Sequence, residues 1–144
     1  MCEGDVFFFC VDPAWDFPPH PKIVLFLTSS RQVIFVHATK NRARAERMCR
    51  LGEPNNNGPL KTLVEITANT CAGISQRSWI ACNGYYEEDE YAITSHHSYT
   101  HCGSATHPIM GAIRVGLLRS DIAPEKQTPI RESLIARSNG LIPF

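Results

Sequence analysis

The sequence predicts a mainly β domain with short helices, arranged as a small, mostly antiparallel barrel or sandwich. Several short runs rich in β-branched and aromatic residues are separated by turn residues, against only one or two helical stretches. The chain has 144 residues, which suits one domain and suffices to bury a core without disulfides or a structural metal. We therefore expect a single domain over residues 1–144.

The predicted domain is centred on a hairpin within residues 21–40. Its two strands are the apolar runs Ile23–Leu27 and Val33–Val36, with the polar break Ser29–Arg31 between them. Both runs are nearly continuous in apolar residues instead of alternating with polar ones. Other parts of the molecule should therefore cover both faces of these strands.

Polar side chains flank the hairpin on both sides of its open end. His20 and Lys22 stand at the start of the first strand, and Thr39 and Lys40 follow the second. In an antiparallel hairpin the start of the first strand lies beside the end of the second. We therefore expect these four residues to converge at one end of the sheet.

The N-terminal segment should form a turn at Gly4–Asp5, a strand over Val6–Val11 and a stiff loop over Asp12–Pro21, whose prolines prevent a helix. Trp15 and Phe17 in this loop have two interpretations. Aromatic rings can stack on nucleic-acid bases, but in such a loop they more often cover the core of a small barrel. We favour the second interpretation.

A short helix is predicted over Asn41–Leu51, with Asn41 or Thr39 as its N-cap and Gly52 as its end. This stretch carries the densest positive charge in the chain, in the form of Arg42, Arg44, Arg47 and Arg50. The arginines either bind phosphates or form a solvated helix face, and the sequence leaves both open. An exposed loop should follow over residues 52–59.

The second half of the chain should add strands over Lys61–Thr67 and Ser78–Cys82, with a turn at Asn69–Gly73 before the second. The acidic run Glu87–Glu90 is expected to break the chain before a weaker strand at Tyr91–Thr94. Short strands of this kind are typical of small antiparallel barrels and sandwiches.

The C-terminal part should be helical. From Gly111 onward apolar residues recur at partly helical spacing, and Pro124 and Pro129 force breaks. We expect one or two short helices here.

Composition limits the classes of function. Fourteen basic and fourteen acidic side chains cancel, so any nucleic-acid site must be local and not the result of an overall positive field. Six scattered cysteines form no C-x-x-C pair and no leader precedes Gly4, which predicts a cytoplasmic protein with reduced thiols. The longest apolar runs fall far short of the ~20 residues that cross a bilayer, so we expect no membrane insertion.

A cluster of potential metal ligands lies near the C-terminal end of the predicted strands: His96, His97, His101, Cys102 and His107. Imidazole and thiolate are good zinc ligands, but the spacing matches no standard zinc motif and the intervening serines and threonines indicate a polar loop. We expect no metal here, and a site formed by His97, His101, Cys102 and His107 is the weaker alternative.

Several motifs, taken in order, resemble the PemK/MazF family of toxins from type II toxin–antitoxin systems. The residues that carry the resemblance are Gly4–Val6, His20–Leu25, Val36–Thr39, Gly73–Ile80 and, more loosely, Gly111–Ile122. The chain departs from the family in two places. Lys22 followed by Ile23 replaces the usual arginine and proline, and residues 91–107 look like an insertion.

The resemblance implies an SH3-like small barrel with a C-terminal helix, and a metal-independent, sequence-selective endoribonuclease that cleaves single-stranded RNA without a cofactor. It implies a homodimer with an antitoxin protein as partner. The catalytic residues would be Lys22, Thr39 and His20, which supply a cation, a hydroxyl and a proton carrier for attack by the substrate's 2′-hydroxyl. The implied RNA-binding residues are Arg31, Lys40, Arg42, Arg77 and Ser78.

Two other functions fit the same residues. SH3-like barrels also serve as binding modules, so a catalytically inactive barrel with a binding or regulatory role is the main alternative. Lysine in place of arginine favours it, because an ammonium cannot hold a phosphate through two parallel hydrogen bonds. A metal-dependent sensor built on the histidine cluster is the third possibility.

Overall fold

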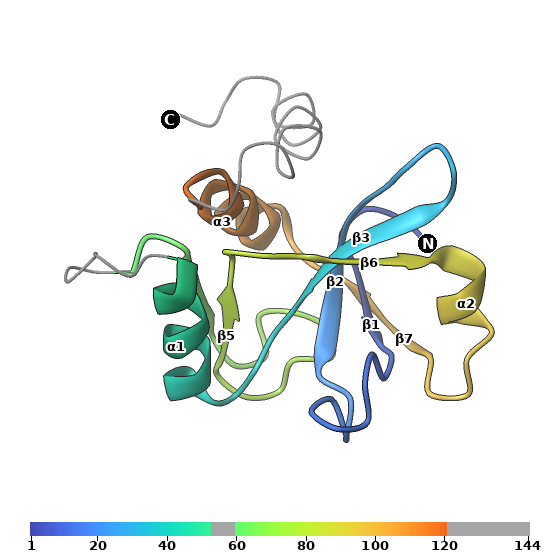
Figure 1. Ribbon diagram of the computed structural model, residues 1–144, viewed down its shortest axis with the longest axis horizontal. Helices are drawn as coiled ribbons and strands as arrows, with labels where there is room; N and C mark the ends of the chain where they lie inside the picture. The colour runs from blue at the N-terminus through green and yellow to red at the C-terminus, as the bar shows by residue number, and fades with distance from the viewer. Residues whose placement is uncertain (53–59, 121–144) are drawn as a thin grey trace.

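A computed structural model describes residues 1–52 and 60–120 as two antiparallel sheets with three helices (Figure 1). The larger sheet has the strand order β6-β3-β2-β1-β7 and the smaller one pairs β4 with β5. The strands are β1 (Asp5–Phe8), β2 (Pro21–Leu27), β3 (Gln32–His37), β4 (Leu63–Ile66), β5 (Ser78–Ala81), β6 (Tyr86–Asp89) and β7 (Thr100–Ser104). The helices are α1 (Arg42–Gly52), α2 (Glu90–Thr94) and α3 (His107–Leu118). The prediction of a mainly β fold with short helices is confirmed.

The central hairpin is confirmed and is slightly longer than predicted. Strands β2 and β3 pair from Lys22↔His37 to Leu27↔Val33, and they occupy the middle of the five-stranded sheet. Alternate residues of each strand enter two separate clusters of buried apolar side chains. Ile23 and Ile34 belong to one cluster, whereas Val24 belongs to the other. Both faces are covered, which explains the nearly continuous apolar runs.

The larger cluster fills the space between the two sheets and α3. Strands β2 and β3 contribute one face, β4 and β5 contribute Ile66 and Ile80, and α3 contributes Met110, Ile113 and Leu117. The smaller cluster lies on the other face of the five-stranded sheet, where Ile93 of α2 packs on it. In Figure 1, α1 and α2 lie on opposite sides of the molecule, with the sheets between them.

A backbone bridge joins the two sheets just after β3. The amide of Thr39 donates to the carbonyl oxygen of Trp79 at 2.9 Å, and the amide of Trp79 donates to the carbonyl oxygen of Thr39 at 2.8 Å. Helix α1 begins three residues after Thr39, and its N-cap is Asn41, whose Oδ1 accepts from the amide of Arg44 at 3.1 Å. The predicted helix and its cap are therefore confirmed.

The predicted turn at Asn69–Gly73 is also confirmed, since both end residues have positive φ angles, of 62° and 75°. Strand β1 stops at Phe8, three residues earlier than expected. Helix α3 begins at His107, four residues before Gly111, with a proline in its first turn as helices tolerate. The expected loop at 53–59 and the helices expected beyond residue 120 lie outside the described residues.

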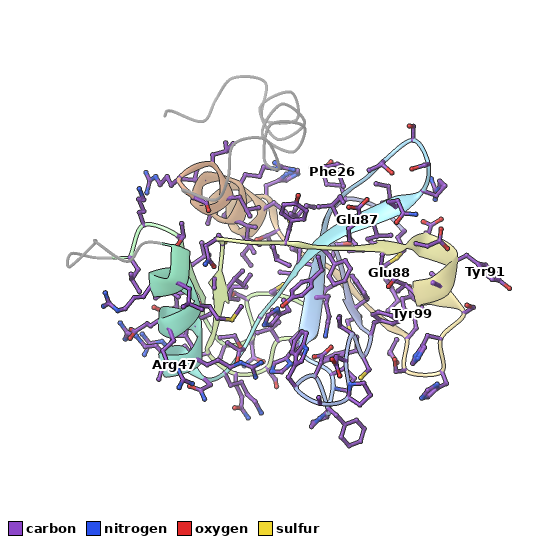
Figure 2. All side chains as sticks on the ribbon, viewed as in Figure 1. Phe26, Arg47, Glu87, Glu88, Tyr91 and Tyr99 are labelled. Atoms are coloured by element: carbon purple, nitrogen blue, oxygen red, sulfur yellow. The ribbon has the colours of Figure 1, made fainter. Side chains whose placement is uncertain are left out.

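Three predictions about residues 87–107 are wrong. The acidic run does not end the strand: Glu87 and Glu88 lie in β6, an edge strand in which both of these side chains are exposed (Figure 2). Tyr91–Thr94 is helical, because Asp89 caps the amide of Ala92 at 3.1 Å. Residues 100–104, expected to be loop, form β7, which pairs with β1 at the other edge of the sheet.

All six cysteines have free thiols. None of the helices in the described part of the chain has the length and apolarity that a membrane span requires.

Candidate functional site

A cavity of about 510 Å³ opens at the end of the hairpin where the four polar residues were expected to meet. Its wall is formed by the proline-rich loop, the segment that joins β3 to α1, and the segment that leads into β5. The side chains with polar chemistry that line it are His20, Thr39, Lys40, Asn41, Arg44, Ser75, Gln76 and Ser78. Thus His20, Thr39, Lys40 and Ser78 come together, and Lys22 does not line the cavity.

Thr39 is held in place by its backbone and still has a hydroxyl proton to donate. Its two backbone hydrogen bonds to Trp79 fix the position of its Cα atom. Its Oγ1 accepts a hydrogen bond from the amide of Asn41 at 3.1 Å. Since that bond uses only a lone pair, the hydroxyl proton is available for a ligand in the cavity.

His20 is oriented by Asp16, a residue that the sequence analysis did not single out. The Nδ1 atom of His20 lies 2.7 Å from Oδ1 of Asp16, and the backbone amide of His20 donates to the same oxygen at 2.8 Å. Asp16 has no exposed surface, whereas the side chain of His20 is 20% exposed. The ring of His20 therefore connects a buried carboxylate to the cavity.

The expected contact between Lys22 and an RNA phosphate needs correction. The side chain of Lys22 has no exposed surface; its Nζ donates to Oδ2 of Asp16 at 2.5 Å and to the carbonyl oxygen of His20 at 2.8 Å. Burial lowers the pKa of Lys22, and the hydrogen bond that its ammonium donates to Asp16 opposes that shift. The ammonium neutralises a buried carboxylate under the site and does not reach the cavity.

His37 lies beside His20 and is also buried, with a ring centroid 5.4 Å from that of His20. Trp15 and Tyr86 pack on it, with centroid distances of 5.6 and 5.4 Å. Burial, together with the nearby charges of His20 and Lys22, lowers the pKa of His37 to about 4. His37 is therefore neutral at pH 7.

The three predicted RNA-binding arginines, Arg31, Arg42 and Arg77, are each paired with a carboxylate. Arg31 lies at the turn of the hairpin, at the end opposite the cavity, and its guanidinium makes hydrogen bonds of 2.6 to 3.0 Å with Glu90. Arg31 therefore does not line the cavity, because the length of the hairpin separates it from the open end. Arg77 donates to Glu65 and lies over the ring of Trp79 at 5.1 Å, immediately before Ser78 at the cavity wall.

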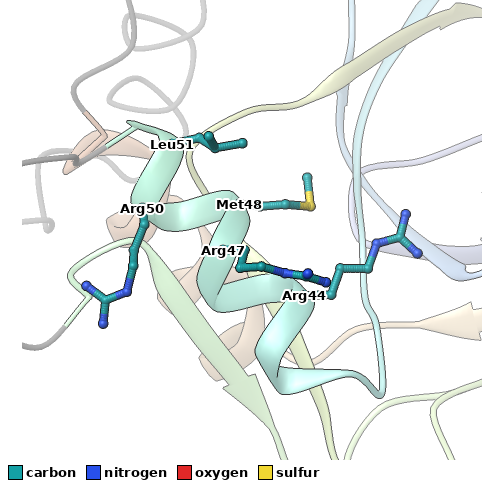
Figure 3. A pocket seen from close by; sticks show the side chains of 5 residues that line it. All are labelled: Arg44, Arg47, Met48, Arg50 and Leu51. Atoms are coloured by element: carbon teal, nitrogen blue, oxygen red, sulfur yellow. The ribbon is translucent and has the colours of Figure 1, made fainter.

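The arginines of α1 make different contacts. Arg42 pairs with Glu46 at 2.8 Å. Arg44 reaches back to the cavity, where its guanidinium lies 5.7 Å from the centroid of Trp15. A second hollow, of about 500 Å³, runs along the helix and is lined by Arg44, Arg47, Met48, Arg50 and Leu51. In Figure 3, Arg44 and Met48 point to the same side, whereas Arg50 points away.

The histidine cluster is dispersed. The ring of His97 stacks on His96 with centroids 4.3 Å apart, and Nε2 of His101 lies 3.6 Å from Oδ1 of Asp5. Cys102 lies in β7, and His107 begins α3. Within residues 1–52 and 60–120, no group of three or more histidine, cysteine, aspartate or glutamate side chains is placed to hold a metal ion.

Comparison with known proteins finds solved structures with a similar fold. Neither a protein-family model nor a curated protein matches the chain. Among solved structures, it is similar to the crystal structure of MazE-MazF (form II) from Deinococcus radiodurans, with a TM-score of 0.51 and 12% identity over 81% of this chain and 90% of that chain. Form III of the same complex gives a TM-score of 0.48 and 12% identity over 81% of this chain and 91% of that chain.

At 12% identity the likeness to form II concerns the fold alone. The antiparallel sheet, its central hairpin and the three helices agree with it. This chain therefore has a MazF-like fold, as the resemblance of its sequence motifs implies.

Proposed function

We propose that the protein is a metal-independent, sequence-selective endoribonuclease that cleaves single-stranded RNA in the cavity at the open end of the β2–β3 hairpin. The observation that carries this proposal is that His20, Thr39 and Lys40 line one cavity in a chain with a MazF-like fold. A proton carrier, a hydroxyl donor and a cation are the groups that metal-free cleavage of a phosphodiester requires.

The substrate supplies its own nucleophile. The 2′-hydroxyl of the nucleotide before the scissile bond loses its proton to Nε2 of His20, and its oxygen attacks the phosphorus. The bond to the 5′-oxygen of the next nucleotide breaks, that oxygen takes up a proton from water, and a 2′,3′-cyclic phosphate remains. The protonated His20 then returns its proton to water. The hydroxyl of Thr39 donates to a phosphate oxygen as negative charge develops there.

The cation in this reaction is assigned to Lys40 and Arg44 and no longer to Lys22. Lys40 is exposed and lines the cavity, and within the described ranges it has no ion-pair partner. Arg44 lines the same cavity. Lys22 contributes from below, by holding Asp16 in its ionised form.

RNA on either side of the scissile bond would meet polar and aromatic groups of the rim. Ser78 and Gln76 form one wall, and Phe17 projects from the proline-rich loop on the other, with 77% of its surface exposed. Arg42 and Arg77 lie outside the wall and exchange their carboxylate partners for phosphates in this proposal. Exposed aromatic rings give single-stranded RNA sites much of their affinity by stacking.

We extend the proposal to partners and setting. The similar solved structure is a complex of MazE with MazF. By that likeness, the protein works in the cytoplasm as a homodimer whose activity is blocked by an antitoxin that fills the cavity.

The test is to incubate the purified protein with a mixed pool of single-stranded RNA, with and without a chelator. Cleavage at a defined sequence that chelation leaves unchanged supports the proposal. Thr39→Ala should reduce cleavage about a hundredfold or more, the usual cost of losing one donor to a developing oxyanion. The matched control is Thr106→Ala, since Thr106 is exposed before α3 and its side chain makes no capping hydrogen bond.

The second candidate is a catalytically inactive barrel that binds RNA or protein. The burial of Lys22 favours it, because the position that aligns with the arginine of the family presents no charge to the cavity. RNA binding without cleavage in the same assay would support this candidate and exclude the nuclease.

A further inference from the structure

The carboxylate of Asp16 is the centre of a buried hydrogen-bond network beneath the cavity. Its Oδ1 accepts from the amide and from Nδ1 of His20, at 2.8 and 2.7 Å. Its Oδ2 accepts from the amide of Val11 at 2.8 Å and from Nζ of Lys22 at 2.5 Å. Asp16 and Lys22 both have side chains with no exposed surface.

This network keeps Asp16 ionised. Burial by itself raises the pKa of a carboxyl group, but the hydrogen bonds from His20, Lys22 and Val11 outweigh it and lower the pKa of Asp16 below its ordinary value. An ionised carboxylate accepts hydrogen bonds only. The nitrogen of His20 that faces Asp16 must therefore carry a proton.

We propose that Asp16 is the positioning residue of the site, which fixes His20 in the Nδ1–H tautomer and so leaves Nε2 free to accept a proton from a ligand in the cavity. Nε2 lies on the ring edge away from Asp16, and within the described residues it has no hydrogen-bond partner. A carboxylate that holds a histidine in this way is the arrangement found in Ser-His-Asp triads. The tautomer of His20 follows from the geometry alone. Its role in accepting a proton from RNA rests on the proposed function.

Lys22 has a defined part in this arrangement. Its compact ammonium fits between Oδ2 of Asp16 and the carbonyl oxygen of His20, so it binds both residues of the pair. It therefore fixes which oxygen of Asp16 faces the imidazole. This explains a lysine at a position where the chain departs from the family's arginine.

The test is long-range proton–nitrogen NMR of the histidine side chains, with His20 assigned from the signal lost in His20→Gln. The parent protein should show His20 in the Nδ1–H tautomer. In Asp16→Asn the amide should turn its oxygen to Lys22 and its NH₂ group to His20, which converts the ring to the Nε2–H tautomer. RNA cleavage should then fall by a factor of about 10⁴, as for the corresponding change in a triad.

Two further variants separate positioning from folding. Lys22→Met removes a partner of Asp16 but leaves a carboxylate facing Nδ1, so His20 should keep the Nδ1–H tautomer. Asp12→Asn is the matched control, since Asp12 is an exposed aspartate of the same loop whose Oδ1 accepts a hydrogen bond from the amide of Ala14. It should change neither the tautomer nor cleavage.

An Nε2–H tautomer in the parent protein, or an unchanged tautomer in folded Asp16→Asn, would overturn the inference. If Asp16→Asn does not fold, the parent and Lys22→Met spectra still decide, because both must show the Nδ1–H form. If the tautomers are as expected but the parent cleaves no RNA, the positioning of His20 stands and the proposed nuclease function fails.

Discussion

Lys22 should matter for stability, because its charge is fully buried. Removing one partner of a buried ion pair leaves the other charge uncompensated and typically costs about 3–5 kcal/mol. We expect Lys22→Ala to lower the free energy of unfolding by about that amount, measured by urea denaturation. Lys22→Arg should also destabilise the protein, because the ammonium has no exposed surface and the larger guanidinium would have to fit in the same buried space.

The control for Lys22 is Lys40→Ala. Lys40 is exposed, and surface substitutions of this kind usually change stability by less than about 0.5 kcal/mol. A Lys22→Ala variant as stable as Lys40→Ala would show that Asp16 and Lys22 are not paired in solution.

His37 should make stability depend on pH. Its pKa is about 4 in the folded protein, against an ordinary value of 6.5, so the unfolded chain binds more protons between those values. The stabilisation is complete above pH 6.5 and is lost as the pH falls towards 4, with a total of about 3 kcal/mol. Urea denaturation of the parent and of His37→Phe should show a steeper slope in the parent between pH 6.5 and about 4.5, above the range in which Glu65 and Glu90 lose their stabilising effect.

The lowered pKa of Asp16 does not contribute to the pH dependence of stability in this range. A carboxyl whose folded pKa is depressed loses its stabilising effect only below its ordinary value, which is 3.8 for aspartate. His97→Phe is the control, since His97 is an exposed histidine whose ring stacks on His96. A His37→Phe variant with the same slope as the parent would contradict the assignment.

At the scale of elements, the proline-rich loop presents Phe17 to solvent at the rim of the cavity. The sequence favours a core-covering role for both aromatic residues of this loop, but in the structure only Trp15 has that role. Trp15 packs on His37 and Tyr86, whereas Phe17 remains 77% exposed. Asp16 between them ties the loop to the buried network, so Phe17 is held at a fixed place.

We expect Phe17→Ala to weaken binding of single-stranded RNA by about 5- to 150-fold, since stacking contributes about 1–3 kcal/mol per base. Phe17→Trp should retain binding. Affinities are best measured by fluorescence anisotropy of labelled RNA in the Thr39→Ala background, where the substrate stays intact. Tyr91→Ala is the control, because Tyr91 is 78% exposed but projects from α2, on another side of the molecule (Figure 2). Equal losses in both variants would exclude a stacking role.

Elements whose own residues specify their conformation were predictable from the sequence. Strands that form only by pairing with a distant strand were not. The hairpin, the Asn41 cap and the turn at Asn69–Gly73 have residues whose own chemistry specifies the conformation. Strands β6 and β7 lack that signal, because acidic and polar sequences form strands only when a neighbouring strand offers its edge. β7 is such a strand, since its pairing with β1 joins residues far apart in the chain.

The same distinction applies to the candidate site. Antiparallel pairing was enough to predict that His20, Thr39 and Lys40 meet, whereas burial of Lys22 depends on how the proline-rich loop folds over it. The available signal for Asp16 was an acidic residue four positions before His20 in a stretch too stiff to be helical. Aspartates in loops are usually solvated, so that signal was weak.

At the scale of the whole molecule, the position of Thr39 on the bridge between the two sheets links the cavity to the integrity of the domain. In the described ranges, the two hydrogen bonds between Thr39 and Trp79 are the backbone bonds that join the sheets. A local separation of the sheets would carry Ser78 and the β5 wall of the cavity away from Thr39 and His20, which stay with the larger sheet, without unfolding either sheet. The free energy needed to open the site is then smaller than the free energy of unfolding the whole domain.

Amide exchange with deuterated solvent can detect that opening. Each of the two amide protons is bonded to the carbonyl of the other residue, so both become exposed in the same event and should exchange at matching rates. A molecule that fills the cavity and contacts both walls would hold the sheets together and slow the two amides by an equal factor. Unequal protection of Thr39 and Trp79 would mean that the two sheets do not separate as units, and an occupant of the α1 hollow should leave both rates unchanged.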